Sequence, residues 1–332
     1  MSSTNVAVPF PDAQPPGYDW FEDEPVFDPE RHLTLEEPAE VIMLTDLGYS
    51  ADEIATKATA VAATTPIRIL SDEGAAQMLT TARRLRPYVR RAGDRVERTT
   101  RGGCYRSKWL RDLATSPDVA AHLSKIYGVD VSPHAMPVHL GHLNYEPSQI
   151  DVAIDKWHHD TIALDYVMMV TDPALVHGGQ FEYFNGTKHE AAAIAAAGEV
   201  PPVERRVAPN VPGPGYAIIL HGDMVVHRAA PITADCERIT MVNAYMSMNP
   251  LVDEQSRSRD LIPVDDHEVL WTEWAKFAAW RSHGRLEHLL ESLPFTPDRD
   301  VVIAQLEASV ADVQRAIADM KTGEVPQEHY GA

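Results

Sequence analysis

The feature that most restricts the fold is the segment between residues 136 and 250, where short apolar runs alternate with turn residues. The runs are rich in β-branched and aromatic residues, and they include VHLGHLNYE, IALDYVMMV, QFEYF, YAIIL, MVVHRAA and RITMVNAYM. The breaks between them contain Gly, Pro, Asp and Asn, as in DPALVHGG, NVPGPG and HGD. Short runs bounded by such residues are typical of strands joined by tight turns. The spacing favours an antiparallel sandwich or jelly roll over a sheet of alternating strands and helices.

Helical patterns flank and interrupt this segment. TLEE, which begins at Thr34, has the form of a capping box, so a helix is expected to run on from there. Helices are also expected over 72–86, where Pro87 would end the helix, and over 117–128. A further helix over 188–198 interrupts the strands. The chain therefore combines a β core with several helices.

The C-terminal region carries a separate helical signal. Thr296, Pro297 and Asp298 predict a helix start, with an N-cap, a first-turn proline and an acid at the positive helix end. Apolar residues then recur at spacings of three and four, namely Ile303, Leu306, Val310, Val313, Ile317 and Met320. Such a stripe belongs either to a helix packed on the body of the chain or to the seam of a homodimer. Both interpretations stay open.

These patterns divide the chain into four parts of one integrated domain. An arm rich in Pro, Asp and Glu covers 1–30, and a helical region packed on the core covers 31–130. The jelly-roll core covers 131–250, and a C-terminal helical region covers 251–332. The expected fold is therefore mainly β with flanking α.

The composition restricts the partners and the compartment. The chain has 49 acidic and 29 basic residues and a formal charge of −20, so its surface as a whole repels nucleic acid and anionic membranes. No apolar run approaches the length needed to span a bilayer. Two cysteines are too few for a disulfide framework, and the first residues lack the pattern of a secretory signal. The expected location is the cytoplasm.

One segment departs from the acidic balance. Residues 83–111 hold eleven of the 29 basic side chains and only two acids, Asp94 and Glu97. One interpretation is a solvated helix face whose cations pair with acidic neighbours. The other is that Arg101, Arg106 or Lys108 holds an anionic group of a substrate.

The sequence WHHD at 157–160 suggests a metal site. In an extended segment, side chains two residues apart share a face, so His158 and Asp160 point the same way and His159 points to the other side. An imidazole and a carboxylate placed in this way can chelate one divalent metal. Two histidines and one carboxylate with open positions are typical of non-haem Fe(II) oxygenases. A third ligand from a later strand is therefore expected.

Two histidines compete for the role of third ligand. His227 lies within a predicted strand, whereas His221 lies in the HGD turn, and we favour His227. The pair His221 and Asp223 has the same spacing as the first pair, although Gly222 between them indicates a hairpin tip. Because a turn can also present ligands, this rival pair stays open.

An arginine and a threonine follow on one strand face. Arg238 and Thr240, in RITMVNAYM, are two residues apart. A guanidinium offers a fixed fork for a carboxylate, and the neighbouring hydroxyl adds one donor. The alternative is an arginine in a surface salt bridge.

His158-x-Asp160, the distal His227 and Arg238-x-Thr240, in this order, resemble the iron(II)/2-oxoglutarate-dependent dioxygenases. GGQFEYFNGTKHE at 178–190 is similar to a strand and turn of the phytanoyl-CoA-hydroxylase-like branch, which acts on small molecules. LNYEP at 143–147 is similar to the segment before the first ligand in many relatives. The resemblance covers residues 136–250.

The resemblance implies a double-stranded β-helix (jelly-roll) core, with Fe(II) held by the two histidines and Asp160. 2-Oxoglutarate would chelate the iron and pair its far carboxylate with Arg238 and Thr240, while O₂ takes the last position. Asn144 or Tyr145 would touch the cosubstrate, unless they make ordinary strand hydrogen bonds. Related halogenases have a small residue at the position of Asp160, which frees a site for chloride. Hydroxylation, or a desaturation or ring-forming variant, is therefore expected rather than chlorination. The substrate would be a small molecule such as an amino acid or another carboxylate, with succinate and CO₂ as coproducts.

Other functions remain in competition. A metal-dependent hydrolase or isomerase on a cupin-like barrel would need the three ligands but not Arg238. A non-catalytic jelly-roll binding protein would have a decayed site, which the complete ligand set disfavours. A nucleic-acid demethylase is disfavoured by the charge of −20, although the basic segment 83–111 keeps it open.

Overall fold

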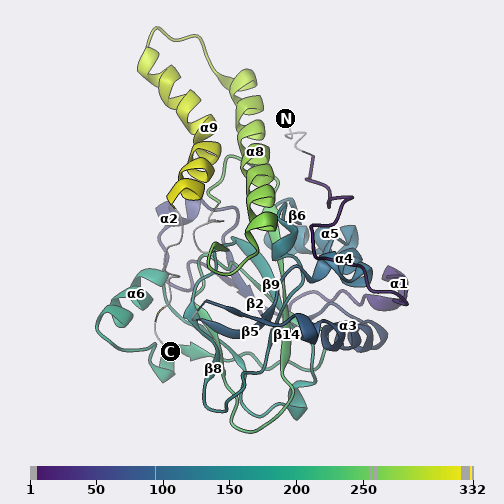
Figure 1. The fold of residues 1–332 in the computed structure, drawn as a ribbon. Coiled ribbons are helices and arrows are strands. Elements are labelled where there is room, and N and C mark those ends of the chain that lie inside the picture. The colour runs from purple at the N-terminus through teal and green to yellow at the C-terminus, as the bar shows by residue number, and fades with distance from the viewer. Residues whose placement is uncertain (1–5, 94, 255, 257–260, 323–329, 331–332) are drawn as a thin grey trace.

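The computed structural model describes residues 6–93, 95–254, 256, 261–322 and 330. Figure 1 shows a central β core with helices around it and a helical hairpin that extends from one end. The helices are α1 (Pro29–His32), α2 (Ala51–Ala55), α3 (Asp72–Leu85), α4 (Lys108–Ala114), α5 (Pro117–Tyr127), α6 (Lys188–Ala196), α8 (His267–Ser292) and α9 (Arg299–Thr322). Short 3-10 turns lie at Arg86–Tyr88, Gly103–Tyr105, Pro137–His139, Pro173–Leu175 and Val203–Arg205.

The β core consists of fourteen strands in one sheet, and every pairing between them is antiparallel. They are β1 (Val41–Met43), β2 (Val61–Thr64), β3 (Ile67–Arg68), β4 (Arg90–Ala92), β5 (Val96–Thr100), β6 (Val131–Pro133), β7 (His142–Tyr145), β8 (Ala153–His158), β9 (Leu164–Met169), β10 (Phe181–Phe184), β11 (Arg206–Val207), β12 (Tyr216–Leu220), β13 (His227–Pro231) and β14 (Ile239–Ser247).

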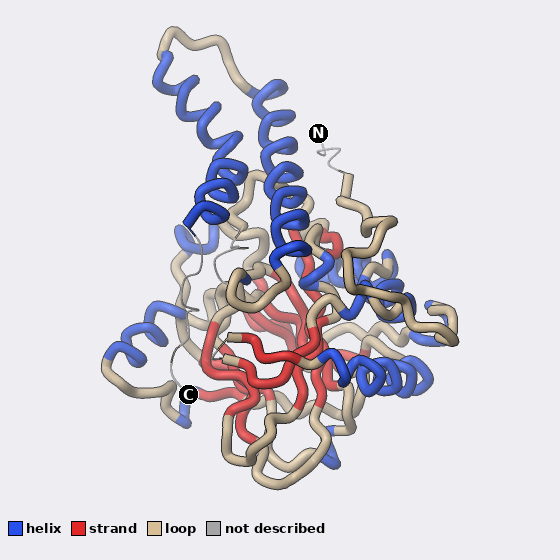
Figure 2. The backbone as a smooth tube through the Cα atoms, in the orientation of Figure 1, coloured by secondary structure: helices blue, strands red, loops and turns tan. Residues whose placement is uncertain are grey.

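The sheet curls into a half-barrel, as the strands in Figure 2 show. Its central path runs β2-β12-β9-β14-β7-β5-β8-β13-β10, so strands distant in sequence lie side by side. Antiparallel strands joined in this non-sequential order, with helices outside, confirm the predicted jelly-roll fold. The order places β8 directly beside β13, the two strands that carry the predicted histidine ligands.

The N-terminal region contributes more strand than the sequence indicated. Residues 31–130 were expected to be helical, yet they supply β1–β5 as well as α2–α5. The strands are two to five residues long, too short for a periodic pattern to stand out. They join the core sheet, and β5 pairs with both β7 and β8.

The helix expected from Thr34 is absent, and that prediction was wrong. The backbone N–H groups of Thr34 and Glu36 donate to the carbonyls of Ile69 and Arg68, so this segment runs beside β3. Pro38 explains why the capping-box pattern fails here, because it lacks the N–H that the next helical turn would need.

The other predicted helices are confirmed near the expected boundaries. Ser71 caps α3 by accepting from the backbone N–H of Gly74, and α3 ends at Leu85, two residues before Pro87. Helix α5 closes at Gly128, which adopts a positive φ of 70° that favours glycine. Thr187 and Glu190 form a capping box at the start of α6.

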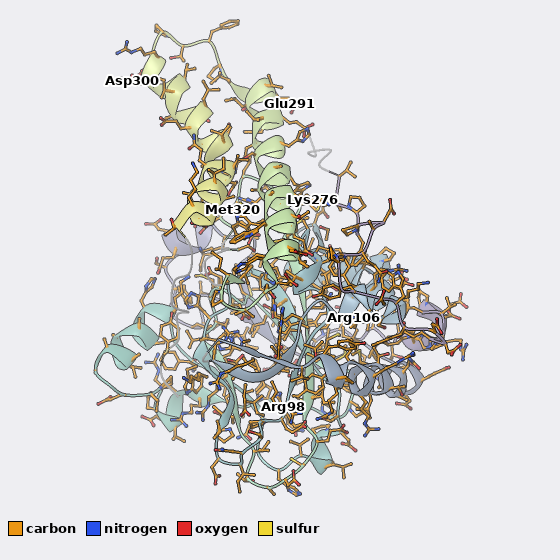
Figure 3. All side chains as sticks on the ribbon, viewed as in Figure 1. Arg98, Arg106, Lys276, Glu291, Asp300 and Met320 are labelled. Atoms are coloured by element: carbon orange, nitrogen blue, oxygen red, sulfur yellow. The ribbon has the colours of Figure 1, made fainter. Side chains whose placement is uncertain are left out.

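The C-terminal hairpin packs α8 against α9 and projects from the body, with Glu291 and Asp300 near its tip and Met320 at its base (Figure 3). The N-cap of α9 is Asp298 rather than Thr296, since Asp298 Oδ1 accepts from the backbone N–H of Asp300. The predicted start was therefore two residues early.

The apolar stripe of α9 divides into two parts. Val313 and Met320 pack, with Ala316, against a cluster that includes Trp274 of α8. Ile303, Leu306 and Ile317 remain about half exposed, at 47%, 48% and 47%. Packing on the body therefore accounts for the inner part of the stripe, and the dimer seam stays a prediction. Among the residues that the structure places, no helix is both long and apolar enough to cross a membrane.

A buried histidine beneath α8 makes the stability of the fold sensitive to acid. His134 is 2% exposed and lies with its ring centroid 4.8 Å from that of Phe277. Burial lowers the pKa of His134 to about 3. Because the unfolded chain titrates near 6.5, it binds one more proton than the native state between pH 6.5 and 3, and stability falls as the pH falls through that range.

Replacing His134 with Gln should therefore reduce the loss of folding stability as the pH falls. The expected difference is up to about 1.4 kcal/mol per pH unit between pH 6 and 4. Urea unfolding at several pH values gives the free energy of unfolding of both proteins. Subtracting the two curves removes the contribution of the titrating groups that both proteins share. Parallel curves for the two proteins would contradict the prediction.

Candidate active site

The ladder between β8 and β13 brings the two predicted histidine ligands together. His158 ends β8 and His227 begins β13, and the two are direct partners in the antiparallel register. Their ring centroids are 4.3 Å apart. Asp160 follows β8 by two residues, and its backbone N–H donates to the carbonyl of Gly222 at 2.8 Å. The last residue of β8, the first residue of β13 and Asp160 just beyond β8 therefore converge at one point.

The three side chains have the geometry of a metal site. His158 Nε2 lies 3.2 Å from Asp160 Oδ1, and His227 Nε2 lies 3.5 Å from Asp160 Oδ2. One ligand atom from each residue lies within 4.8 Å of the others, and no other such group was found among the described residues. Two imidazoles and one carboxylate match the donor set of non-haem Fe(II) sites.

The outer nitrogens of both rings fix the orientation of the ligands. His158 Nδ1 lies 2.6 Å from the carbonyl of Lys156, and His227 Nδ1 lies 3.0 Å from the carbonyl of Val225. A carbonyl only accepts, so each Nδ1 must carry the proton and each Nε2 must present its lone pair to the centre. This is the arrangement that a metal ion requires of histidine.

The protonation states suit the same role. Burial, together with the nearby Arg95 and His227, lowers the pKa of His158 to about 3, and burial also lowers the pKa of His227. Both imidazoles are therefore neutral at pH 7. Burial alone would raise the pKa of Asp160, but His227 and His158 outweigh it and hold the pKa of that carboxyl below its usual range. A buried carboxylate facing two neutral imidazoles is suited to a cation.

The rival pair is not assembled as a metal site. Asp223 is fully buried, and its carboxylate pairs with Lys188 at 3.1 Å and with Lys57 at 3.5 Å. The group of three potential ligands found among the described residues does not include His221. The HGD turn therefore lies beside the three potential ligands and is not part of that group.

Gly222 of this turn is needed because the turn lies against the side chains of Asp160 and Asp165. A Cβ at position 222 would meet Asp165 Oδ2 at 2.3 Å and Asp160 Cβ at 2.9 Å. Both distances are too short for a side chain, so only glycine permits the approach. The glycine between His221 and Asp223 was noticed in the sequence, but we interpreted it as a hairpin tip.

A small cavity, here called the inner cavity, joins the three ligands to Arg238. Its lining residues are Arg95, His142, Asn144, Asp155, His158, Asp160, Val167, Phe181, His227, Arg228, Ala229, Arg238, Thr240 and Val242. Arg238 is 1% exposed, which excludes the surface salt bridge, and its Nη1 donates to Thr240 Oγ1 at 2.9 Å. Burial lowers the pKa of Arg238 to about 10, so the guanidinium remains charged at pH 7.

The two residues expected beside the cosubstrate lie on opposite faces of β7. Asn144 lines the inner cavity. Tyr145 points away, since its hydroxyl donates to the carbonyl of Ala82 at 2.8 Å and its ring lies under Arg86. The expected contact of Tyr145 with the cosubstrate is therefore corrected, because alternation along the strand turns it into the core behind the sheet.

His158, Asp160 and His227 are here called the metal group. A second cavity, the outer cavity, adjoins this group at Asp160. It is lined by Ala92, Arg95, Val96, Thr99, Arg101, His139, His142, Asn144, His159, Asp160, Thr161, Ile162, Leu261 and Val264. Arg101 therefore lies where a substrate residue was expected. His159 does not point to the metal group, and its Nδ1 lies 2.6 Å from the Tyr330 hydroxyl.

Arg106 and Lys108 do not reach either cavity, so their expected substrate role is corrected. The Arg106 guanidinium stacks on the rings of Tyr18 and Tyr88, at 4.4 Å and 3.9 Å from their centroids. Lys108 lies over the ring of Trp20. Both cations fasten the N-terminal arm to the body. Further cations of the basic segment pair with acids of the same chain: Arg83 with Glu237, Arg86 with Glu146, Arg90 with Asp265 and Arg95 with Asp155.

Two residues that line both cavities were missed in the sequence. His142 lies two residues before Asn144, so it shares the inward face of β7, and it lines both cavities. Arg95 also lines both, and its Nε lies 3.0 Å from Asp155 Oδ1. The spacing of His142 and Asn144 could have identified His142. Nothing local in the sequence distinguishes Arg95 from its basic neighbours.

A family model described as "HalD: Halogenase D" matches residues 91–261, which is just over half of the chain. The chain belongs to the Halogenase D family. The match spans the three converging side chains, the inner cavity and every residue that lines the outer cavity except Val264. A comparison with curated proteins finds no match.

Several solved structures are similar to the chain at low identity. The non-heme alpha-ketoglutarate-dependent epimerase SnoN from nogalamycin biosynthesis is 19% identical, covering 55% of this chain and 78% of its own, with a TM-score of 0.40. The non-heme monooxygenase ThoJ, in a nickel complex, is 15% identical, with coverages of 82% and 98% and a TM-score of 0.42. EctD from S. alaskensis, solved with 2-oxoglutarate and 5-hydroxyectoine, is 18% identical, with coverages of 65% and 86% and a TM-score of 0.40.

The match to a halogenase family confirms the prediction of an enzyme, and the assembled ligand group agrees with the predicted non-haem iron(II) site. The phytanoyl-CoA-hydroxylase-like branch stays a prediction. So do the roles assigned to individual residues, the cytoplasmic location and the homodimer through the C-terminal helix.

Proposed function

We propose that this protein is an Fe(II)/2-oxoglutarate-dependent oxygenase that hydroxylates an unactivated C–H bond of a small molecule. The observation that carries the proposal is the convergence of His158, Asp160 and His227 at a cavity that also contains the buried Arg238. A metal site and a carboxylate site lie in one cavity, as a chelating dicarboxylate requires.

Each residue then has a distinct task. His158, Asp160 and His227 would hold Fe(II), and when bound, the metal with 2-oxoglutarate and O₂ supplies the oxidising chemistry. Arg238 and Thr240 would bind the far carboxylate of 2-oxoglutarate through charge-assisted hydrogen bonds. The carbonyls of Lys156 and Val225 keep both imidazoles in the ligating tautomer. Burial of both histidines and of Arg238 limits the access of water to the reacting atoms.

Asp160 favours hydroxylation even though the family is described as a halogenase family. Its carboxylate oxygens lie 3.2 Å and 3.5 Å from the two ligating nitrogens, so the third position of the coordination face is taken by the protein. In the related halogenases noted above, a small residue leaves this position open to chloride. The same position in this chain offers no room for a halide ligand.

The product formed in chloride buffer tests this reaction. With Fe(II), 2-oxoglutarate and O₂, metabolite fractions that raise succinate release should yield a product with one added oxygen and no chlorine, measured by mass spectrometry. Asp160→Gly should lower hydroxylation at least about a hundredfold, because loss of a first ligand exceeds the 10–100-fold cost of losing an outer partner. A chlorinated product from the wild-type protein would contradict the proposal.

The alternatives make different demands on the site. A hydrolase or isomerase with the same ligands has no use for a buried guanidinium in the metal cavity. A non-catalytic binding protein has no need of three ligands held in the ligating tautomer. For a nucleic-acid demethylase, the basic segment would have to face the nucleic acid, yet Arg83, Arg86 and Arg95 pair with acids of the same chain.

A further inference from the structure

The outer cavity lies directly beside the metal group. It shares Arg95, His142, Asn144 and Asp160 with the inner cavity. A molecule in the outer cavity would therefore lie next to the metal and outside the position assigned to 2-oxoglutarate. The volume is about 60 Å³, room on the order of four to six water-sized groups, which restricts the occupant to a small molecule.

The lining of the cavity contains both apolar and polar residues. The apolar residues are Ala92, Val96, Ile162, Leu261 and Val264. The polar residues include Arg101, His139, His142, Asn144 and Thr161. A ligand with an aliphatic part and a polar head would satisfy both sets of side chains.

His139 offers an unused hydrogen-bond donor. Its Nδ1 lies 3.4 Å from Arg101 Nη2, and a guanidinium can only donate. Nδ1 must therefore accept, and the proton of the neutral ring lies on Nε2. Burial lowers the pKa of His139 well below its usual value, in agreement with a neutral ring. Nε2 is buried and has no partner among the described residues, and such a donor is costly to leave unpaired.

The ion pair with Asp265 uses only part of the Arg101 guanidinium. Its Nε and Nη2 donate to the two oxygens of Asp265, at 2.5 Å and 2.9 Å. The side chain of Arg101 is 9% exposed. Within the described part of the chain, Nη1 makes no hydrogen bond or ion pair. A structural link to Asp265 therefore uses one edge of the guanidinium and leaves the other edge for a ligand.

We propose that the outer cavity binds the substrate, a small aliphatic carboxylate, with the carboxylate on Arg101 and His139 and the chain against Val96, Ile162 and Val264. The carboxylate accepts from Arg101 Nη1 and His139 Nε2, both donors at neutral pH. The aliphatic part then faces Asp160 and the metal. The identification of this ligand as the substrate rests on the proposed oxygenase function, but its binding can be measured separately.

Calorimetric titration with isovalerate tests the site. The full-length protein is held under nitrogen with Fe(II) and saturating 2-oxoglutarate, so that the inner cavity is occupied. Wild-type protein should bind isovalerate, and Arg101→Met and His139→Phe should each weaken binding by about tenfold to a hundredfold, the effect of losing one charge-assisted hydrogen bond. Arg106→Met is the matched control and should bind as the wild type does, because Arg106 lies outside both cavities.

Related ligands and a second signal define the outcomes. Isoamyl alcohol, isoamylamine and isoamyl phosphate should bind more weakly than isovalerate. No binding of isovalerate, tighter binding of the amine or the phosphate, or an equal loss in Arg106→Met would overturn the proposal. If Arg101→Met does not fold, as judged by circular dichroism, His139→Phe alone decides.

The weak visible band expected from anaerobic Fe(II) with 2-oxoglutarate separates the two proposals. A band without isovalerate binding would overturn the substrate assignment and keep the oxygenase. Isovalerate binding that depends on Arg101 without any band would keep the carboxylate site and overturn the oxygenase.

Discussion

Replacing His227 with alanine is expected to abolish retention of iron and to lower succinate formation by at least about a thousandfold. The ring supplies one of three converging donors, and its loss leaves His158 and Asp160 to hold the ion as a two-residue chelate. Loss of an outer partner of a metal ligand costs 10–100-fold, and loss of the ligand itself must cost more. Iron content after anaerobic loading and gel filtration, together with succinate release, measures both effects.

The rival histidine provides the matched control. His221 is equally buried, at 1% exposed, and lies only six residues earlier in the same segment. His221→Ala should lower stability through the lost packing but should keep iron. A result in which His221→Ala loses iron while His227→Ala retains it would move the metal centre to the HGD turn and overturn the site described above.

Replacing Arg238 with methionine should raise the KM for 2-oxoglutarate about 30-fold to several thousandfold while iron binding persists. Methionine keeps the approximate volume of the side chain but removes the charge that would face the far carboxylate. Truncating one partner of a buried, hydrogen-bonded charge pair costs about 2–5 kcal/mol, which corresponds to this range of affinity. Steady-state succinate formation over a range of 2-oxoglutarate concentrations measures it.

A surface arginine near Arg238 controls for a general loss of charge. Arg83 pairs with Glu237, the residue before Arg238, and its side chain is 57% exposed. Arg83→Met should change the KM by less than about threefold, because exposed ion pairs contribute little. Turnover of Arg238→Met at the wild-type rate and KM would favour the metal-dependent hydrolase or isomerase.

The parts of the site that depend on strand alternation were predictable. His158 and Asp160, like Arg238 and Thr240, lie two residues apart, and the structure brings each pair into the same cavity. The same rule was not applied at β7, where it would have selected His142 with Asn144 and rejected Tyr145. That error was one of interpretation, because the periodicity was visible in the sequence.

The other errors arose where long-range contacts outweigh a local pattern. TLEE has the form of a helix start, yet the backbone of Thr34 and Glu36 pairs with residues 68 and 69. The basic segment offered Arg101, Arg106 and Lys108 as equals. Only the chain path places Arg101 at a cavity and places Arg106 between the rings of Tyr18, in the N-terminal arm, and Tyr88, in the body.

The sequence by itself determined the type of core and the two pairs of side chains that share a strand face, His158 with Asp160 and Arg238 with Thr240, because apolar alternation and donor spacing are local properties of a strand. The tertiary structure alone decided which strands are neighbours, and so which histidine joins the pair and which arginine reaches the outer cavity. The physical reason is that side chains distant in sequence meet only after the sheet has curled, when hydrogen-bond register and burial select one of several locally acceptable partners.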